Sequence, residues 1–215
     1  MNQNQSPRLF CIFNRNDPTP TALALRNIPW VSATIFVIGK EDFNQKHLDN
    51  LRRLESWIEG TAKNFTDDAE GPWPEHLWLD EWDWDPLPSD CIEFVEISSV
   101  ESEILPYFQN GDIVDLTAGR KDHSGMMVIQ AKANQIELEY MVQTQSGETL
   151  NLNTGDFSKN SESLSLKERI WLTSGYILNP EAEGDSKFGE IWTQAEKIIQ
   201  VKEKKLRHNK KIRPS

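Results

Sequence analysis

The sequence predicts an α/β fold: a Rossmann-like parallel sheet with helices on both faces, an irregular tryptophan-rich insertion and C-terminal helices. Apolar, β-branched runs at residues 8–13 and 34–39 are continuous rather than alternating, which is typical of strands buried on both faces. Segments with apolar residues every three or four positions lie between such runs, as in amphipathic helices. Strands that alternate with helices favour a doubly wound sheet.

Two strand–helix units open the chain. After the first strand, residues 14–21 form a loop of turn-forming residues, and a short helix begins near Ala22, behind a proline. The strand at residues 34–39 is followed by a helix at about residues 41–60, whose apolar residues share one face.

Residues 61–90 interrupt this alternation with four prolines and four tryptophans. The acidic residues between the tryptophans would repel a phosphate backbone, which argues against stacking on single-stranded nucleic acid. We interpret the segment as an irregular insertion whose tryptophans pack internally or bind a protein partner.

The alternation resumes after the insertion. The predicted elements are a strand at 91–97, a helix at 100–108, a strand at 112–116, a helix at 123–135 and a strand at 136–142. Because the last of these strands alternates apolar and polar residues, we expect it nearer an edge of the sheet.

The rest of the chain is more polar. It predicts a hairpin turn at residues 146–147, a surface loop at 151–162 and an amphipathic helix opened by a capping box, Ser165 with Glu168. A last helix at about residues 187–207 runs into a basic tail. We therefore divide the chain into a Rossmann-like ligand-binding domain at 1–180 and a C-terminal helix and tail at 181–215.

Charge and composition exclude several functions. The formal net charge is −11, and residues 202–213 carry +6, which leaves −17 on the remainder. Because the chain outside residues 202–213 is strongly acidic, we do not expect it to bind duplex nucleic acid. No apolar run is long enough to span a bilayer and no signal peptide is evident, so we expect a cytoplasmic protein. The two cysteines form no metal pattern, and we expect neither a disulfide nor a cofactor.

Ligands of doubly wound sheets bind at the carboxyl ends of the strands, so the loops after the first and fourth predicted strands are the candidate site. Gly119 allows a sharp turn, and backbone N–H groups at the start of the next helix, with Arg120 and Lys121, would attract an anion. The alternative is a simple strand–helix turn with solvated cations. The predicted ligand-binding residues are Asn14, Asn16, Thr19, Thr21, Thr117, Ala118, Gly119 and Ser124.

Asp115 ends the strand before this loop. An acid there can accept hydrogen bonds from the turn, and we expect a structural role for it. His123 is either a proton-transfer group or a solvated side chain at the start of the helix.

The segment from Val114 to Lys121, read Val-Asp-Leu-Thr-Ala-Gly-Arg-Lys, resembles the Asp-Leu-Thr-Gly-Gly-Thr-Lys motif of CRISPR-associated Rossmann-fold (CARF) domains. The polar, proline-containing loop at residues 16–21 is similar to the loop after the first strand in that family. The resemblance covers about residues 8–180. Ala118 and Arg120 depart from the family's Gly and Thr, so a hydroxyl is absent and a charge replaces it.

The resemblance implies that a homodimer binds a cyclic oligoadenylate messenger in CRISPR antiviral defence, with loops of both subunits facing the ring. Some relatives, the ring nucleases, also cut the ring without metal, through attack of the ligand's 2′-hydroxyl on the adjacent phosphate. Lys121 and Arg120 would then stabilise the developing charge, His123 would transfer a proton, and Thr117 and Asn16 would orient the ligand.

Other functions stay open. One alternative is a non-catalytic sensor. Another is an interaction protein that uses residues 61–90 to bind a protein partner. An ordinary nucleotide-binding enzyme is disfavoured because no Gly-rich dinucleotide or Walker-type loop is present. We find no second nuclease domain, since the C-terminal helices are too few to form one.

Overall fold

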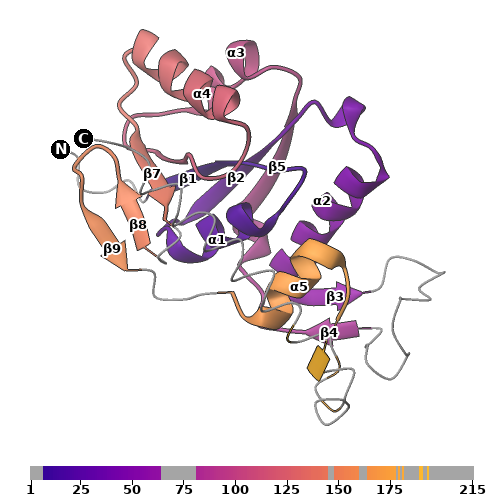
Figure 1. Cartoon of the computed structure of the whole chain (residues 1–215). Helices are drawn as coiled ribbons and strands as arrows, with labels where there is room; N and C mark the ends of the chain where they lie inside the picture. The colour runs from indigo at the N-terminus through magenta and orange to yellow at the C-terminus, as the bar shows by residue number, and fades with distance from the viewer. Residues whose placement is uncertain are drawn as a thin grey trace, which may run out of the picture.

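The computed structural model describes residues 7–63, 81–144, 148–159 and 164–177, together with residues 179, 181, 189, 190 and 193. Its main sheet has seven strands in the order β5-β2-β1-β6-β7-β8-β9, and the first five are parallel (Figure 1). These five strands are β1 (Arg8–Ile12), β2 (Ser32–Ile38), β5 (Ile92–Ile97), β6 (Ile113–Asp115) and β7 (Glu139–Gln143). The predicted α/β class and parallel Rossmann-like sheet are confirmed.

Helices cover both faces of the sheet because its central strands are apolar on both sides. In β1, Leu9 and Cys11 pack in one core, while Phe10 and Ile12 pack in the other. The first core is closed by α1 (Thr19–Asn27), α2 (Gln45–Ile58) and α5 (Leu166–Ser174). The second is closed by α3 (Val100–Glu103) and α4 (Lys121–Ala133), on the opposite side of the sheet in Figure 1.

The strand order reverses its direction of growth between β1 and β6. The chain proceeds from β1 outward to β2 and β5, and then returns to add β6 and β7 on the other side of β1. The loops after β1 and β6 therefore leave the sheet side by side while their helices pack on opposite faces. This is the switch point at which open α/β sheets bind ligands.

Several helix boundaries differ from the predictions. The helix expected at 123–135 begins two residues earlier, so α4 has Lys121 as its first residue and Arg120 as its N-cap. The helix expected at 100–108 is divided into α3 and a 3₁₀ turn at Leu105–Tyr107, because Pro106 cannot donate to a continuing helix. Helix α2 begins at Gln45, where Asn44 accepts the His47 N–H in a capping box.

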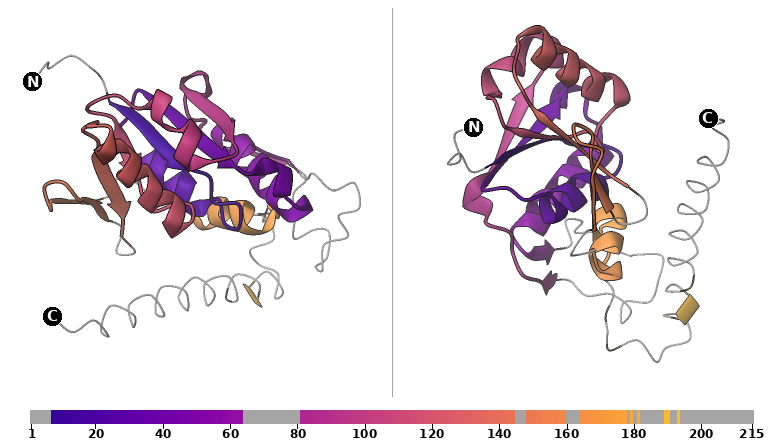
Figure 2. Two further views of the ribbon diagram at one scale, coloured as in Figure 1. Left: turned by 90° about the horizontal axis from the view of Figure 1, so that it is seen from above. Right: turned by 90° about the vertical axis from the view of Figure 1, so that its left-hand side faces the viewer.

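The surface loop expected at 151–162 contains a strand instead. Strand β8 (Glu148–Asn151) pairs antiparallel with β7, and β9 (Phe157–Lys159) pairs with β8. The hairpin closes through Asn151, whose backbone N–H donates to the Asp156 carbonyl at 2.9 Å. Strand β9 was not predicted because it has only three residues and none of them is buried, so no apolar alternation marks it. The hairpin extends from one end of the sheet in Figures 1 and 2.

The insertion at residues 61–90 is more regular at its ends than predicted. Strands β3 (Thr61–Lys63) and β4 (Glu81–Asp83) form a separate antiparallel pair. Trp82 and Trp84 pack against the first core, and the Trp84 indole donates to the Trp57 carbonyl at 3.0 Å. These two tryptophans serve packing, while Trp73 and Trp78 lie outside the described residues.

The predicted helix at 187–207 and the basic tail lie almost wholly outside the described residues. Among the helices that the structure does describe, none is long and apolar enough to cross a bilayer.

Candidate functional site

The loops after β1 and β6 touch at the carboxyl edge of the sheet. Gly119 has φ of +79°, and a Cβ added there would lie 2.7 Å from Ile12 Cγ2, at the end of β1. The position therefore accepts glycine alone without strain. This contact fixes the β6–α4 loop directly beside the β1–α1 loop, as the sequence predicted.

Asp115 holds the β6–α4 loop from beneath. Its fully buried carboxylate accepts hydrogen bonds from the Thr117 N–H and hydroxyl, at 3.2 and 2.7 Å, and from the Ala118 N–H at 3.2 Å. Burial raises the pKa of Asp115 from 3.8 to about 6, against these hydrogen bonds and the charge of Lys121, which lower it. The contacts are those of the structural role expected for Asp115.

Three of the predicted ligand residues also hold this loop. The Thr117 hydroxyl accepts the Gln143 N–H at 2.6 Å, which ties the loop to β7. Ala118 is fully buried, and the Ser124 hydroxyl, which is also buried, donates to the Ala118 carbonyl at 3.4 Å. In this conformation Ala118 and Ser124 lie beneath the surface that a ligand would meet.

The cations of the loop differ in their availability. Arg120 forms a bidentate ion pair with Asp122, with Nε–Oδ1 and NH2–Oδ2 distances of 3.1 and 2.7 Å. Lys121 is exposed and makes no hydrogen bond or ion pair within the described part of the chain. It begins α4, where the helix dipole adds to its positive charge. Lys121 is therefore the more available of the two for an anion.

The β1–α1 loop is built from turns that use their own polar side chains. Asn14 Oδ1 accepts the Asn16 N–H at 3.1 Å, and Asp17 Oδ1 accepts the Thr19 N–H at 3.1 Å. Asn16 is exposed, whereas Thr21 is fully buried and its hydroxyl donates to the Ile12 carbonyl at 3.4 Å. The structure thus places Asn16 in solvent, Asn14 at a half-buried position and Thr21 in the interior.

Sequence reasoning missed Arg15, which lies within the predicted β1–α1 loop, between Asn14 and Asn16. Burial is the largest cause that lowers the pKa of His47 and of His123, and the charge of Arg15 is a smaller cause for both. The Arg15 carbonyl accepts the Asn50 Nδ2–H at 2.8 Å, and Asn50 is buried. A lone arginine among the turn-forming residues after the first strand was the available signal.

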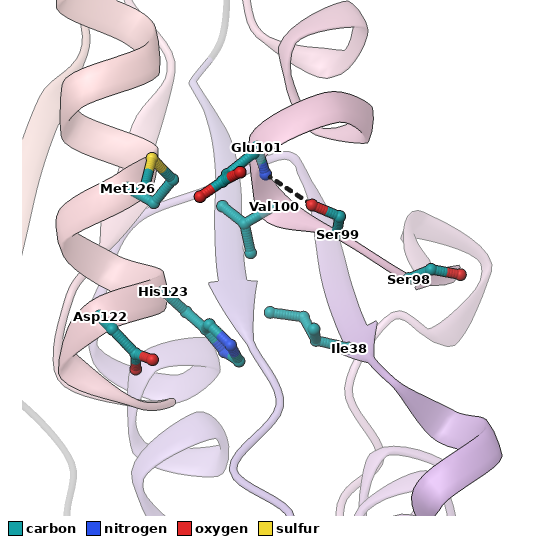
Figure 3. A pocket seen from close by; sticks show the side chains of 8 residues that line it. All are labelled: Ile38, Ser98, Ser99, Val100, Glu101, Asp122, His123 and Met126. Carbon is teal, nitrogen blue, oxygen red and sulfur yellow. Dashed lines mark hydrogen bonds between the residues drawn. The ribbon is translucent and has the colours of Figure 1, made fainter.

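A cavity of about 240 Å³ opens next to the β6–α4 loop (Figure 3). It lies between α4 and the ends of β2 and β5. Its lining residues are Ile38, Ser98, Ser99, Val100, Glu101, Asp122, His123 and Met126. In Figure 3 the His123 ring is directed from α4 toward Ile38. The residues at 98–101 were not predicted, because a strand–helix turn of serines carries no distinctive motif.

Several groups favour the neutral form of the His123 ring, which lines this cavity. Burial lowers its pKa first, Arg120 and Arg15 lower it further, and Asp122 opposes them. A neutral imidazole can accept a proton. Within the described ranges, no group of three or more His, Cys, Asp or Glu side chains is placed to hold a metal ion.

Comparison with known proteins finds solved structures of similar fold. No protein-family description matches the sequence, and no curated protein does. Among solved structures, the chain is similar to Can2 from Sulfobacillus thermosulfidooxidans in complex with cyclic tetra-adenylate, at 12% identity and a TM-score of 0.50, over 77% of this chain and 40% of that one.

A second similar structure is a type III CRISPR defence DNA nuclease activated by cyclic oligoadenylate. It is 13% identical, with a TM-score of 0.50, over 78% of this chain and 24% of its own. The chain thus spans less than half the length of either protein. At these identities the likeness is one of fold.

Proposed function

We propose that the chain binds a cyclic oligoadenylate, with the β1–α1 and β6–α4 loops against the ring's phosphates. One observation carries the proposal: Gly119 and Ile12 bring Lys121 and the Arg15 loop together at the switch point of the sheet. The resemblance of residues 114–121 to the CARF motif supports it. So does the similarity in fold to Can2, which was determined with cyclic tetra-adenylate.

The charge distribution suits a small anion better than a nucleic-acid duplex. The chain as a whole carries −11, so a long phosphate backbone would meet repulsion beyond the site. At the site itself, Lys121 begins α4, whose N-terminal end favours negative charge, and Arg15 lies in the loop before α1. A compact ring can contact these cations without crossing the acidic surface.

We further propose that two copies of the chain share one ring. A ring of repeated nucleotides has rotational symmetry, and a two-fold dimer would present Lys121 and Asn16 of each subunit to opposite halves of it. One subunit offers these residues on one side only, at the carboxyl edge of its sheet. A dimer would therefore complete the site.

In the catalytic form of this proposal, the ring is cut without metal. The ligand's 2′-oxygen attacks the adjacent phosphorus and the bond to the 5′-oxygen breaks, which leaves a 2′,3′-cyclic phosphate and a 5′-hydroxyl. The proton passes from the 2′-hydroxyl to a base and then to the leaving oxygen. Lys121 would stabilise the charge on the phosphoryl oxygens, with Arg120 beside it, and the neutral His123 would be the base.

The second candidate is a sensor that binds the ring and leaves it intact. The bidentate pair between Arg120 and Asp122 favours it, because Asp122 neutralises one of the two cations that cleavage would employ. A protein-binding role of residues 61–90 is less favoured, since Trp82 and Trp84 pack against the core.

The test is incubation of the purified chain with labelled cyclic tri-, tetra- and hexa-adenylate in EDTA, with complexes and linear products scored separately. Lys121→Ala should weaken binding or abolish cleavage. Lys132→Ala, which removes an exposed lysine from the last turn of the same helix, should change neither. Intact ring in a tight complex would identify a sensor, and no interaction with any ring would refute the proposal.

A further inference from the structure

We infer that the cavity between α3 and α4 takes one adenine base of the ring and that Glu101 selects it by accepting a hydrogen bond from the exocyclic amine. This inference rests on the proposed function and adds the source of base specificity. The phosphates would lie on the cations outside the cavity, while the base enters it.

The size of the cavity suits a single base. Its volume of about 240 Å³ is below the range of roughly 300–1,000 Å³ that is typical of pockets for drug-sized ligands. Ile38, Val100 and Met126 provide apolar and sulfur contacts that a flat aromatic ring can use. Figure 3 shows these three side chains and His123 around one opening.

The charges of the wall disfavour a phosphate. Glu103 Oε1 already accepts the N–H groups of Ser98 and Ser99, at 3.1 and 2.9 Å, and the Ser99 hydroxyl accepts the Glu101 N–H at 3.2 Å. These three backbone N–H donors of the turn are thus occupied. Two carboxylates, those of Glu101 and Asp122, line the cavity and would repel an anion.

Of these two carboxylates, only that of Glu101 remains for a ligand. Both oxygens of Asp122 are bound by Arg120. The Glu101 side chain makes no hydrogen bond or ion pair within the described part of the chain, and in Figure 3 its carboxylate lies over the cavity beside Met126. An ionised carboxylate only accepts hydrogen bonds, so it selects a base that presents an amine.

Adenine presents such an amine at N6, and hypoxanthine has a carbonyl oxygen at the same position. A carboxylate would bind the first and repel the second, as in the recognition of base edges in nucleic acids. The amide of a glutamine can accept or donate, so Glu101→Gln should tolerate both bases. Comparing ligands that carry adenine with ligands that carry hypoxanthine therefore tests the role of Glu101.

The experiment compares the binding of cyclic tetra-adenylate and cyclic tetra-inosinate. The wild-type chain should prefer the adenylate ring by roughly tenfold, since a charged hydrogen bond is replaced by repulsion. Glu101→Gln should reduce this preference several-fold, chiefly through tighter binding of the inosinate ring. Glu93→Gln, an exposed glutamate on β5 outside the cavity, is the matched control and should keep the preference.

Two further variants separate this inference from the proposed function. Lys121→Ala should weaken both rings equally, because phosphate contacts carry no information about the base. Met126→Trp should fill the cavity and weaken both rings without lowering the melting temperature. If Lys121→Ala weakens binding but Glu101→Gln leaves the preference unchanged, the base pocket is refuted and ring binding stands. If the wild-type chain binds neither ring, both proposals fall.

Discussion

Thr117 donates its hydroxyl proton to Asp115 Oδ1 over 2.7 Å and accepts the Gln143 N–H with the same oxygen over 2.6 Å. One hydroxyl thus joins the end of β6 to the end of β7. The loop that carries Lys121 is thus bonded to Asp115 at the end of β6 and to Gln143 on β7. Both bonds pass through the Thr117 hydroxyl, whose orientation depends on the buried Asp115 carboxylate.

Asp115→Asn should therefore weaken ring binding without unfolding the chain. An amide has one acceptor oxygen, whereas Asp115 accepts three hydrogen bonds through two oxygens, so the Ala118 N–H would face an NH₂ group. We expect a loss of roughly tenfold or more in ring affinity, from an unsatisfied donor of about 1–3 kcal/mol. Isothermal titration of both proteins with cyclic tetra-adenylate measures it, and equal affinities would contradict this role of Asp115.

The raised pKa of Asp115 makes the stability of the chain depend on pH. Because its pKa is about 6 in the fold and 3.8 ordinarily, the folded state holds the proton more tightly. The folding stability that comes from this tighter proton binding is fully present below pH of about 4. It is lost as the pH rises through about 6, and the loss is up to about 3 kcal/mol. Denaturation of the wild type and Asp115→Asn at pH 4 to 7 should show their difference in unfolding free energy falling as pH rises. A difference that increases with pH would contradict the sign.

Gly119→Ala should destabilise the fold as well as the site. The new Cβ would lie 2.7 Å from Ile12 Cγ2, in a backbone conformation that alanine rarely adopts, at a cost of about 1–3 kcal/mol. Gly125→Ala is the matched control: it lies within α4 with nothing within 4 Å of a new Cβ, and it should stabilise by about 0.5–1 kcal/mol. Opposite shifts in melting temperature are expected, and shifts of the same sign would refute this reading of Gly119.

Glu168 is expected to be the chief polar anchor of α5. Its carboxylate forms an ion pair with Arg26 at 2.7 Å. It also accepts hydrogen bonds from the Trp57 indole N–H at 3.0 Å and from the Ser165 N–H at 2.7 Å. Burial acts to raise the pKa of Glu168, but these hydrogen bonds outweigh it and lower the pKa. Its stabilisation is therefore present at neutral pH and lost as the pH falls through the lowered folded-state pKa.

Glu168→Ala should accordingly cost about 3 kcal/mol at pH 7, since it leaves a partly buried arginine without this carboxylate. Glu139→Ala, at an exposed position on β7, should cost much less. Urea denaturation of the two variants provides the comparison, and losses of equal size would show that Glu168 is not an anchor.

The sequence was sufficient to predict the parts of the fold that depend on local patterns. Continuous apolar runs identified the central strands, and the pairing of Ser165 with Glu168 correctly predicted the capping box that starts α5. Gly119 was identified as the turn from its position alone. Each of these signals depends only on a few residues that are neighbours in the sequence.

Contacts between distant segments could not be predicted in this way. Nothing near Glu168 in the sequence indicates Arg26, because the two meet only when α5 packs on α1. The cavity is lined by the end of β2, the turn after β5, α3 and α4, and no motif spans them. Arg120 was expected to face a ligand, yet its pairing with Asp122 depends on the direction in which α4 starts.

The strand order also determines which strands lie at the edges of the sheet, where another molecule could pair with them. The sheet ends in β5 on one side and β9 on the other, and exposed edge strands can pair with other molecules. Strand β5 carries exposed Glu93 and Glu96, and Glu96 pairs with Lys40, so an approaching strand would meet fixed charges. Strand β9 is only three residues long and ends in Lys159. We expect charge on one edge and brevity on the other to oppose pairing of these edges with a neighbouring molecule.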